Sequence, residues 1–489
     1  MKKSCGILLP ISSLTSKYGI GSFSKEAYNF IDKLARANQK YWQILPLNPT
    51  SYGDSPYQAF SSFAGNPYFI DLDKLIEEDL LTLNDLQYLD FGSDKRNINY
   101  ELLYKNRFIC LKSAFKKWSE GHKVSEFHLK QEIIDYSFFM ALKDYFHGKS
   151  WLEWPEDIKY RNKETIIHYE NTLEEEINFY QFLQIKFNEQ WQNLKNYSHS
   201  KGISIIGDIP IYVALDSTEC WVNKELFEFN EKSEPTFVAG CPPDGFSADG
   251  QLWGNPLYNW KYHEETNYSW WISRMKYTFE LYDIVRVDHF RGFDEYYKIP
   301  FGDINAKNGH WAKGPGIKLF KAIKEELGNL KIIAEDLGFL TPSVIELLRE
   351  TGYPGMKVLQ FAFDSREESD YLPHNYTANS VVYTGTHDNN TILGWYNDLN
   401  ETDKAYAIKY LYENVNKTDK VNFDFISLAY SSISHLAIIP LQDILGSDSS
   451  GRINTPSTLG FNWQWRILEN EFNDQLINEI NILTKKYNR

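Results

Sequence analysis

The sequence predicts an α/β protein that folds as a (β/α)8 TIM barrel. Two observations carry this prediction: short apolar runs recur eight times along the 489 residues, and patterns with helical spacing lie between several of them. Strands that alternate with helices pair in parallel, and strands that are apolar throughout are buried on both faces. The runs occupy residues 7–10, 42–47, 203–209, 284–288, 332–335, 356–361, 381–384 and 436–440.

Helix signals follow several of these runs. After the first run, apolar residues at positions 23, 27, 30, 31 and 34 share one helix face. After the fourth, a helical pattern begins at Ile317 and ends at Gly328, a residue that favours helix ends. After the fifth, Thr341 and Pro342 form an N-cap and first-turn pair, and the helix ends near Gly352. An open doubly wound sheet is the alternative, but the chain lacks the glycine-rich nucleotide-binding motifs of such sheets.

Two intervals are too long for an ordinary crossover between strands. About 155 residues separate the second and third runs, and about 75 separate the third and fourth, whereas typical connections are far shorter. The first interval contains long helical patterns, and the second is rich in Gly, Pro and Trp. We therefore expect one catalytic barrel domain over 1–489, with an inserted helical subdomain at 51–200. A long inserted loop region at 211–282 is expected to border the substrate groove.

Composition and charge indicate which classes of partner and which cellular location to expect. The formal net charge of -15 repels phosphate backbones, so we expect no nucleic acid partner. No stretch reaches the roughly 20 apolar residues of a membrane helix, so we expect no membrane partner. The opening apolar run is interrupted by Pro10 and is predicted to be a strand, not a signal peptide. The four cysteines form no C-x-x-C pair, which favours free thiols in a reducing cytoplasm.

The fourth run ends in the most informative stretch of the chain, which contains Arg286, Asp288 and His289. Side chains alternate along a strand, so Arg286 and Asp288 face the same way. A carboxylate beside a guanidinium stays ionised, because the positive charge favours the charged form. Such a carboxylate is suited to act as a nucleophile or to stabilise positive charge.

Acidic residues also end three other runs. Asp208 is the second-last residue of the third, Glu335 ends the fifth, and His387 and Asp388 follow shortly after the seventh. Active sites of these barrels lie at the carboxyl ends of the strands, so these side chains are expected to converge. Asp and Asn after a strand often only cap the next helix, but histidine and arginine do not cap helix N-termini. Metal binding by the histidines and carboxylates is a second alternative; no H-x-H or H-E-x-x-H motif supports it, and we expect no metal.

Several carboxylates without a cofactor motif suit glycosidic-bond chemistry. This chemistry needs one carboxylate as nucleophile and one carboxylic acid as proton donor. Arg286 favours Asp288 as the nucleophile, and the longer Glu335 on the next strand suits the acid/base role. Asp388 is suited to hold sugar hydroxyls and favour ring distortion.

The chain resembles a known family, the 4-alpha-glucanotransferases of the amylomaltase (disproportionating enzyme) type. These form glycoside hydrolase family 77 of the alpha-amylase clan. The resemblance runs nearly from end to end and includes the strand-end motifs around Asp288, Glu335 and Asp388. Further matching motifs are Gly6-Ile7-Leu8-Leu9-Pro10, Asp54-Ser55-Pro56-Tyr57, Gly207-Asp208-Ile209-Pro210, Gly250-Gln251-Leu252-Trp253-Gly254-Asn255-Pro256 and Gly451-Arg452-Ile453-Asn454-Thr455-Pro456.

The resemblance implies roles for residues at matching positions. Asp288 resembles the nucleophile, Glu335 the acid/base and Asp388 the transition-state stabiliser. Residues that resemble those around the sugar next to the broken bond are Arg286, Asp208, His289 and His387. Residues that resemble glucan contacts in loops over the groove are Tyr52, Ser55, Tyr57, Asp249, Gln251 and Trp253. We also expect Asn389, beside Asp388, to bind substrate.

The implied reaction transfers an α-1,4-glucan segment from a donor to the 4-hydroxyl of glucose or a maltooligosaccharide, with retention of configuration and without a cofactor. A retaining α-amylase-like hydrolase is the first alternative, because the carboxylates alone do not decide between sugar and water as acceptor. A glucan-binding protein without activity is the second, but it predicts that a catalytic carboxylate would be replaced, and none is. The sequence leaves the oligomeric state open.

Overall fold

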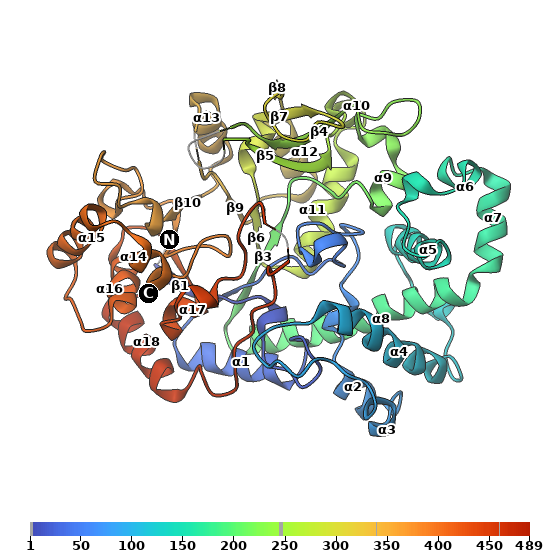
Figure 1. Cartoon of the computed structure of the whole chain (residues 1–489), viewed down its shortest axis with the longest axis horizontal. Coiled ribbons are helices and arrows are strands. Elements are labelled where there is room, and N and C mark those ends of the chain that lie inside the picture. Colours follow the sequence, from blue (N-terminus) through green and yellow to red (C-terminus); the bar gives the residue numbers. More distant parts are fainter. Residues whose placement is uncertain (1–2, 244–247, 339, 459) are drawn as a thin grey trace.

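The computed structural model describes residues 3–243, 248–338, 340–458 and 460–489; the side chain of Tyr52 also lies outside the described part. Its centre is a closed barrel of eight parallel strands in the order β1-β12-β11-β10-β9-β6-β3-β2 (Figure 1). The strands are β1 (Ser4–Leu8), β2 (Tyr41–Gln43), β3 (Ser204–Ile209), β6 (Ile284–Val287), β9 (Ile332–Ala334), β10 (Gly355–Val358), β11 (Ser380–Tyr383) and β12 (Leu436–Pro440). Each of the eight apolar runs contributes one strand, so the predicted barrel is confirmed.

A compact apolar cluster fills the space between these strands. It contains alternate strand residues, among them Ile206 of β3, Ile333 of β9 and Val381 of β11. Because side chains alternate, the residue two positions further along a strand faces the same way. Asp208 and Glu335 therefore continue the inward-facing series of Ile206 and Ile333 at the carboxyl ends of their strands. The barrel thus changes from an apolar core to a polar mouth within two residues.

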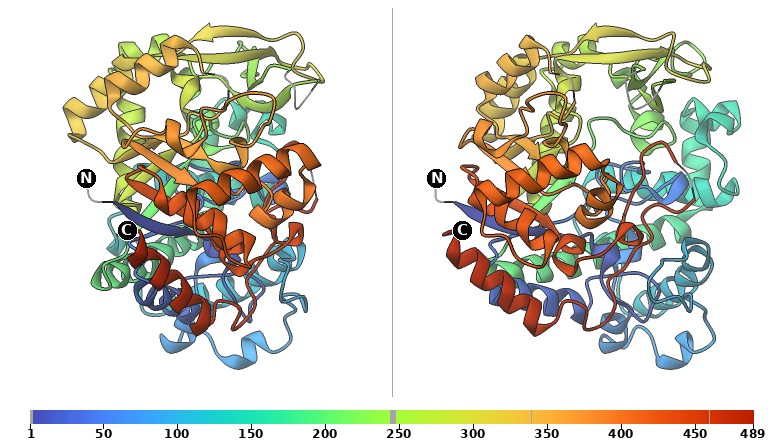
Figure 2. Two further views of the ribbon diagram at one scale, coloured as in Figure 1. Left: turned by 90° about the vertical axis from the view of Figure 1, so that its left-hand side faces the viewer. Right: turned by 60° about the vertical axis from the view of Figure 1, so that its left-hand side comes forward.

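Helices surround the barrel and pack against one another (Figure 2). Those that follow or flank barrel strands are α1 (Lys25–Arg36), α11 (Ser269–Leu281), α12 (Ile317–Leu327), α13 (Pro342–Thr351), α14 (Ile392–Asp398), α15 (Glu401–Asn414), α16 (Val421–Ser431), α17 (Leu441–Leu445) and α18 (Asp474–Lys486). Gly328 follows α12 with φ 76°, and Thr341 caps α13 through its side chain, as predicted. Gly352 ends α13 in the left-handed conformation that glycine favours. No helix in the described ranges has the length and apolar character needed to cross a membrane.

The interval between β2 and β3 is mainly helical. It contains α2 (Leu72–Glu77), α3 (Leu83–Leu86), α4 (Tyr100–Trp118), α5 (Gln131–Tyr145), α6 (Glu156–Lys159), α7 (Lys163–Thr172) and α8 (Glu174–Ser200). The long helix α8 packs against α4 and α5 of the insertion and against α1 of the barrel layer. Its buried residues, such as Phe187 and Trp191, join the main hydrophobic cluster of the barrel helices. The inserted helices therefore share one core with the barrel.

The interval between β3 and β6 is more regular than the long loop that the sequence predicts. It contains α9 (Thr218–Val222), β4 (Phe237–Cys241), β5 (Gln251–Pro256) and α10 (Trp260–Glu265), followed by α11. Strands β4 and β5 join β7 (Glu295–Pro300) and β8 (His310–Lys313) in a four-stranded sheet of order β5-β4-β7-β8. All three pairings in this sheet are antiparallel. The sheet lies outside the barrel, at the top of Figure 1.

Candidate active site

The guanidinium of Arg286 links two carboxylates at the mouth of the barrel. Arg286 lies beside Asp208 on the neighbouring strand, and its Nη1 donates to both oxygens of Asp208 at 2.9 and 2.7 Å. Its Nη2 forms a salt bridge with Asp288 Oδ1 at 2.9 Å. Burial opposes the charge of Arg286, but the two carboxylates outweigh it, so the pKa of Arg286 is raised. The arginine is thus a fixed positive charge between Asp208 and Asp288.

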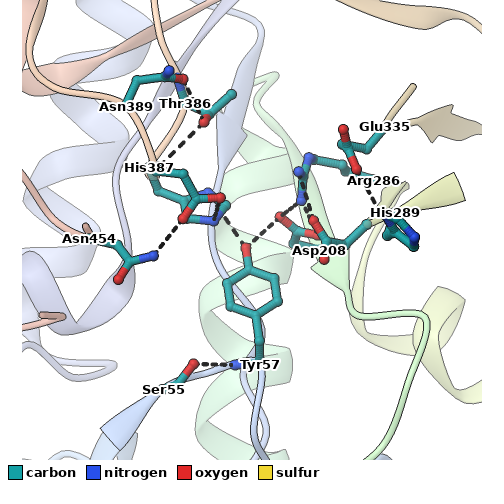
Figure 3. Close-up of polar contacts among 12 residues, drawn as sticks. Ser55, Tyr57, Asp208, Arg286, His289, Glu335, Thr386, His387, Asn389 and Asn454 are labelled. Atoms are coloured by element: carbon teal, nitrogen blue, oxygen red, sulfur yellow. Dashed lines mark hydrogen bonds and ion pairs between the residues drawn. The ribbon is translucent and has the colours of Figure 1, made fainter. Parts of the chain in front are cut away.

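Glu335 follows β9 and lies in a different electrostatic environment. Its Oε2 accepts a hydrogen bond from the backbone N–H of His289 at 2.7 Å (Figure 3). Its Oε1 accepts one from the backbone N–H of Leu337 at 2.9 Å. Burial, together with the negative charge of Asp288, raises the pKa of Glu335 to about 7. A carboxyl group with this pKa both gives and takes a proton near neutral pH.

His289 forms the turn that presents its backbone N–H to Glu335. Its backbone is left-handed, with φ 51° and ψ 48°, which is uncommon for a residue other than glycine. The imidazole meets the ring of Trp253 edge to face, with ring centres 4.9 Å apart. Burial lowers the pKa of His289 to about 4, so the ring is neutral at physiological pH. A neutral imidazole can donate and accept hydrogen bonds, but it carries no positive charge that would pair with the nearby carboxylates.

His387 and Asp388 lie in the loop after β11 and interact with each other. His387 Nε2 is 3.2 Å from Asp388 Oδ2, and Asn454 Nδ2 donates to Asp388 Oδ1 at 2.6 Å. Burial disfavours the charge of Asp388, but His387 and Asn454 outweigh it, so the pKa of Asp388 is lowered. Burial likewise disfavours charge on His387, but Asp388 prevails and raises the pKa of His387. Asp388 is therefore held as a carboxylate.

Tyr57 lies in the segment that follows β2 and contacts both Asp208 and His387. Its hydroxyl donates to Asp208 Oδ2 at 2.9 Å, and its ring stacks on His387 with centres 5.1 Å apart (Figure 3). The hydroxyl of Ser55 accepts a hydrogen bond from the backbone N–H of Tyr57 at 3.2 Å. Tyr57 thereby connects residues of β3 and the β11 loop.

The remaining residues that the sequence predicts as substrate contacts have other partners. Gln251 Oε1 accepts a hydrogen bond from Trp253 Nε1 at 3.0 Å, which ties it to the Trp253–His289 contact. Asp249 forms a salt bridge with Lys307 at 2.5 Å, and its side chain is 66% exposed. Asn389 Oδ1 accepts hydrogen bonds from the backbone N–H and the hydroxyl of Thr386, both at 2.9 Å. The predicted contact at Tyr52 lies outside the described side chains.

Asn454 and Arg452 belong to the site although the sequence assigns them no role. Arg452 Nη2 donates to the backbone carbonyl of Asp388 at 2.7 Å, and its Nε donates to the carbonyl of Asn454 at 2.8 Å. Asn454 in turn holds the Asp388 carboxylate. Their motif, Gly451-Arg452-Ile453-Asn454-Thr455-Pro456, is visible in the sequence, but nothing local connects it to a loop more than 60 residues earlier.

The site combines carboxyl groups in contrasting states. Asp288 is paired with a guanidinium, whereas Glu335 is half-buried, has a raised pKa and interacts with the charge of Asp288. A carboxyl group that keeps its proton near neutral pH can act as an acid, while a carboxylate fixed beside a guanidinium can act as a nucleophile. Among the described residues, no three His, Cys, Asp or Glu side chains form a group able to hold a metal ion. The fold and the site define a (β/α)8-barrel enzyme with several carboxyl groups at the mouth of its barrel, the type of side chain that glycosidic-bond chemistry uses.

Comparison with known proteins identifies the family. A family model described as 4-alpha-glucanotransferase matches residues 9–470. The 4-alpha-glucanotransferase of Clostridium butyricum is 48% identical over 485 residues, which cover 98% of this chain and 99% of that protein. That of Streptococcus pneumoniae is 47% identical over 495 residues, which cover 100% and 98%. The structure of amylomaltase from Streptococcus agalactiae in complex with acarbose matches with a TM-score of 0.97 at 42% identity and full coverage of both chains. This chain belongs to the 4-alpha-glucanotransferase family.

Proposed function

We propose that this 4-alpha-glucanotransferase works by a retaining double displacement in which Asp288 carries the transferred glycosyl group. The donor is a maltooligosaccharide or a starch-like α-1,4-glucan, and the acceptor is the 4-hydroxyl of glucose or a maltooligosaccharide. One observation carries the proposal: Asp288 is paired with Arg286, while Glu335 beside it has a pKa raised to about 7.

In the first step, Asp288 attacks the anomeric carbon of the donor. Glu335, in its protonated form, gives its proton to the departing glycosidic oxygen, and the leaving chain diffuses away. The raised pKa of Glu335 supports this role, because a usual glutamic acid would have lost its proton at neutral pH. The carboxylate of Asp288 becomes a glycosyl ester, and the configuration at the anomeric carbon inverts.

In the second step, Glu335 acts as the base. It takes the proton from the acceptor 4-hydroxyl, whose oxygen attacks the same anomeric carbon and releases Asp288. The second inversion restores the α configuration, and Glu335 is again protonated for the next cycle. These steps use only the carboxyl groups of the chain and draw on no cofactor or metal.

Asp388 and the residues around it stabilise the transition state in this proposal. A carboxylate held by His387 and Asn454 accepts hydrogen bonds from sugar hydroxyls and favours the positive charge that develops on the ring. Arg286, Asp208, His289 and His387 surround the sugar next to the broken bond. Tyr52, Ser55, Tyr57, Asp249, Gln251, Trp253 and Asn389 are proposed glucan contacts. The proposed location is the cytoplasm.

Incubation with maltotriose tests the function. The proposal predicts glucose together with a ladder of longer maltooligosaccharides, and a nearly constant number of reducing ends. A steady rise in reducing ends without longer products would instead indicate an α-amylase-like hydrolase. Asp288→Asn removes the nucleophile, so the ladder should be at least about a thousandfold slower to form. Wild-type activity in this variant would refute the assignment of Asp288.

A further inference from the structure

The loop that carries Asp388 is fixed at both of its ends by a single side chain. Thr384, the first residue after β11, opens this loop, and Ile392, the first residue of α14, follows it. Both residues bind to Asp443 of α17. Asp443 Oδ2 accepts a hydrogen bond from the Thr384 hydroxyl, and its Oδ1 accepts one from the Ile392 backbone N–H at 2.7 Å. One carboxyl group thus joins the two ends of the Asp388 loop.

Asp443 has little freedom to move. It is 1% exposed and lies on the short helix that follows β12 directly. Its backbone carbonyl accepts a hydrogen bond from Asn422 Nδ2 of α16 at 2.8 Å, and α16 packs against α17. The carboxyl group is therefore a fixed point between the barrel and the helices around it.

A carboxyl group in this position needs an explanation. In the described part of the chain, no lysine, arginine or histidine forms a salt bridge with Asp443, and burial raises the pKa of Asp443 to about 6. Burying a carboxyl group without a cation is costly, and its hydrogen bonds offset this cost only in part. Both side-chain hydrogen bonds of Asp443 go to the ends of one loop, so the location of that loop is what the group determines.

The same helix also binds the segment that holds the Asp388 carboxylate from the other side. Gln442, which precedes Asp443, donates from Nε2 to the Gly451 carbonyl at 3.3 Å. Gly451 lies three residues before Asn454, whose Nδ2 donates to Asp388 Oδ1. Two adjacent side chains of α17 therefore connect the Asp388 loop and the segment of Asn454 to one support.

We propose that Asp443 is a positioning residue for the transfer reaction, which sets the location of the Asp388 carboxylate by joining both ends of its loop. This inference rests on the transition-state role proposed above for Asp388. Asp443 is too deeply buried to contact a glucan, so it acts through the loop. A displacement of about 1 Å at a reacting group can slow an enzyme about a hundredfold, which makes such support important for the rate.

Two substitutions of Asp443 test the proposal with maltotriose as substrate. Asp443→Ala removes both contacts, so kcat should fall about ten- to a hundredfold with a smaller change in KM. Asp443→Asn keeps both contacts, because its amide oxygen accepts from the Ile392 N–H and its NH2 group donates to the Thr384 oxygen. The kcat of Asp443→Asn should therefore stay within about fivefold of the wild type. An asparagine variant as slow as the alanine variant would overturn the proposal.

Asp424 provides a matched control on α16. It is also fully buried, and its Oδ1 accepts hydrogen bonds from the backbone N–H and the hydroxyl of Thr418 at 2.7 and 2.9 Å. Burial raises its pKa as well. Asp424→Ala should destabilise the protein to urea but leave kcat unchanged. Equal losses of kcat in Asp424→Ala and Asp443→Ala would show that general stability is responsible and would overturn the proposal.

The Asp388→Asn background separates this inference from the proposed mechanism. In this background, Asp443→Ala should not lower the remaining kcat further, because the carboxylate that Asp443 positions is already absent. A further loss as large as in the wild type would overturn the inference and leave the role of Asp388 standing. Full activity of Asp388→Asn by itself would contradict the role of Asp388 and the inference together.

A second pair of variants applies if Asp443→Ala does not fold, as judged by circular dichroism. Thr384→Val removes one of the two contacts at nearly constant volume, and kcat should fall at least about threefold. Thr384→Ser keeps the hydroxyl and should retain the wild-type kcat. Unchanged kcat in Thr384→Val, or equal losses in the two variants, would overturn the proposal.

Discussion

The guanidinium of Arg286 forms a salt bridge with Asp288, with Nη2 2.9 Å from Oδ1. The other end of the same guanidinium is anchored on Asp208, whose side chain is fully buried. Asp288 is therefore oriented by a group that has little freedom to move. Such preorganisation lowers the cost of bringing a nucleophile to the reacting carbon.

The raised pKa of Glu335 predicts how the rate of donor cleavage depends on pH. Its pKa is raised to about 7, and the first step needs the protonated form. As pH rises through 7, the protonated fraction falls, so kcat/KM for maltotriose should decrease about tenfold per pH unit above the pKa. Glucosyl fluoride is the control, because fluoride leaves without a proton. A fluoride profile that falls in parallel with the maltotriose profile would contradict the acid role.

Asn454 should position Asp388 without being needed for folding. Asn454→Ala removes the 2.6 Å hydrogen bond to Asp388 Oδ1, and we expect kcat to fall about ten- to a hundredfold with a smaller change in KM. Asn462→Ala is the matched control, since Asn462 bonds to Thr455 and Thr458 in the same loop and not to Asp388. Equal losses in the two variants would show that loop stability, not the Asp388 contact, matters.

Tyr57 allows its hydroxyl and its ring to be tested separately. Tyr57→Phe keeps the ring stacked on His387 but removes a hydrogen bond to the buried Asp208, which we expect to reduce kcat/KM about tenfold. Tyr57→Leu also removes the stacking and should cost more. Tyr376→Phe, which loses a hydroxyl bonded to the Tyr371 carbonyl, should leave activity unchanged. Full activity in Tyr57→Phe would refute a role for the hydroxyl.

Gly207, which precedes Asp208 in β3, packs closely against the ring of Tyr282. A Cβ at this position would come within 2.1 Å of the Tyr282 ring, which is fully buried behind β3. Gly207→Ala should therefore lower the free energy of unfolding by about 1–3 kcal/mol through overpacking, measured by urea denaturation. Gly121→Ala has open space around its Cβ and should not destabilise the protein by this mechanism. Equal stability of the Gly207 variant and the wild type would contradict the close packing.

The barrel was predictable because burial leaves a local signal. A strand that is buried on both faces reads as a continuous apolar run, and each of the eight runs is a barrel strand. Ile333 is apolar and Glu335, two residues further on the same face, is acidic. This change from apolar to acidic indicated that the polar residues lie at the strand ends. The helix boundaries at Gly328 and Thr341 followed from local backbone chemistry.

The parts that were missed depend on contacts between distant segments. The β5-β4-β7-β8 sheet takes strands from before and after β6, so no single stretch of sequence shows it. Tyr57 and His387 are 330 residues apart, and their stacking follows only from the closure of the barrel. Asn454 reaches Asp388 from a loop between two helices that carries no strand signal.

Covalent glycosylation of Asp288 distinguishes a double displacement from a single displacement. Glu335→Gln treated with α-glucosyl fluoride should form the ester, because fluoride needs no acid, but release it slowly, because no base is left. Mass spectrometry of peptic fragments should then find a single hexosyl group on Asp288 of this variant and none in the variant that also carries Asp288→Asn. A hexosyl group on another residue, or none on Asp288 while fluoride is released in a burst, would show that Asp288 is not the nucleophile.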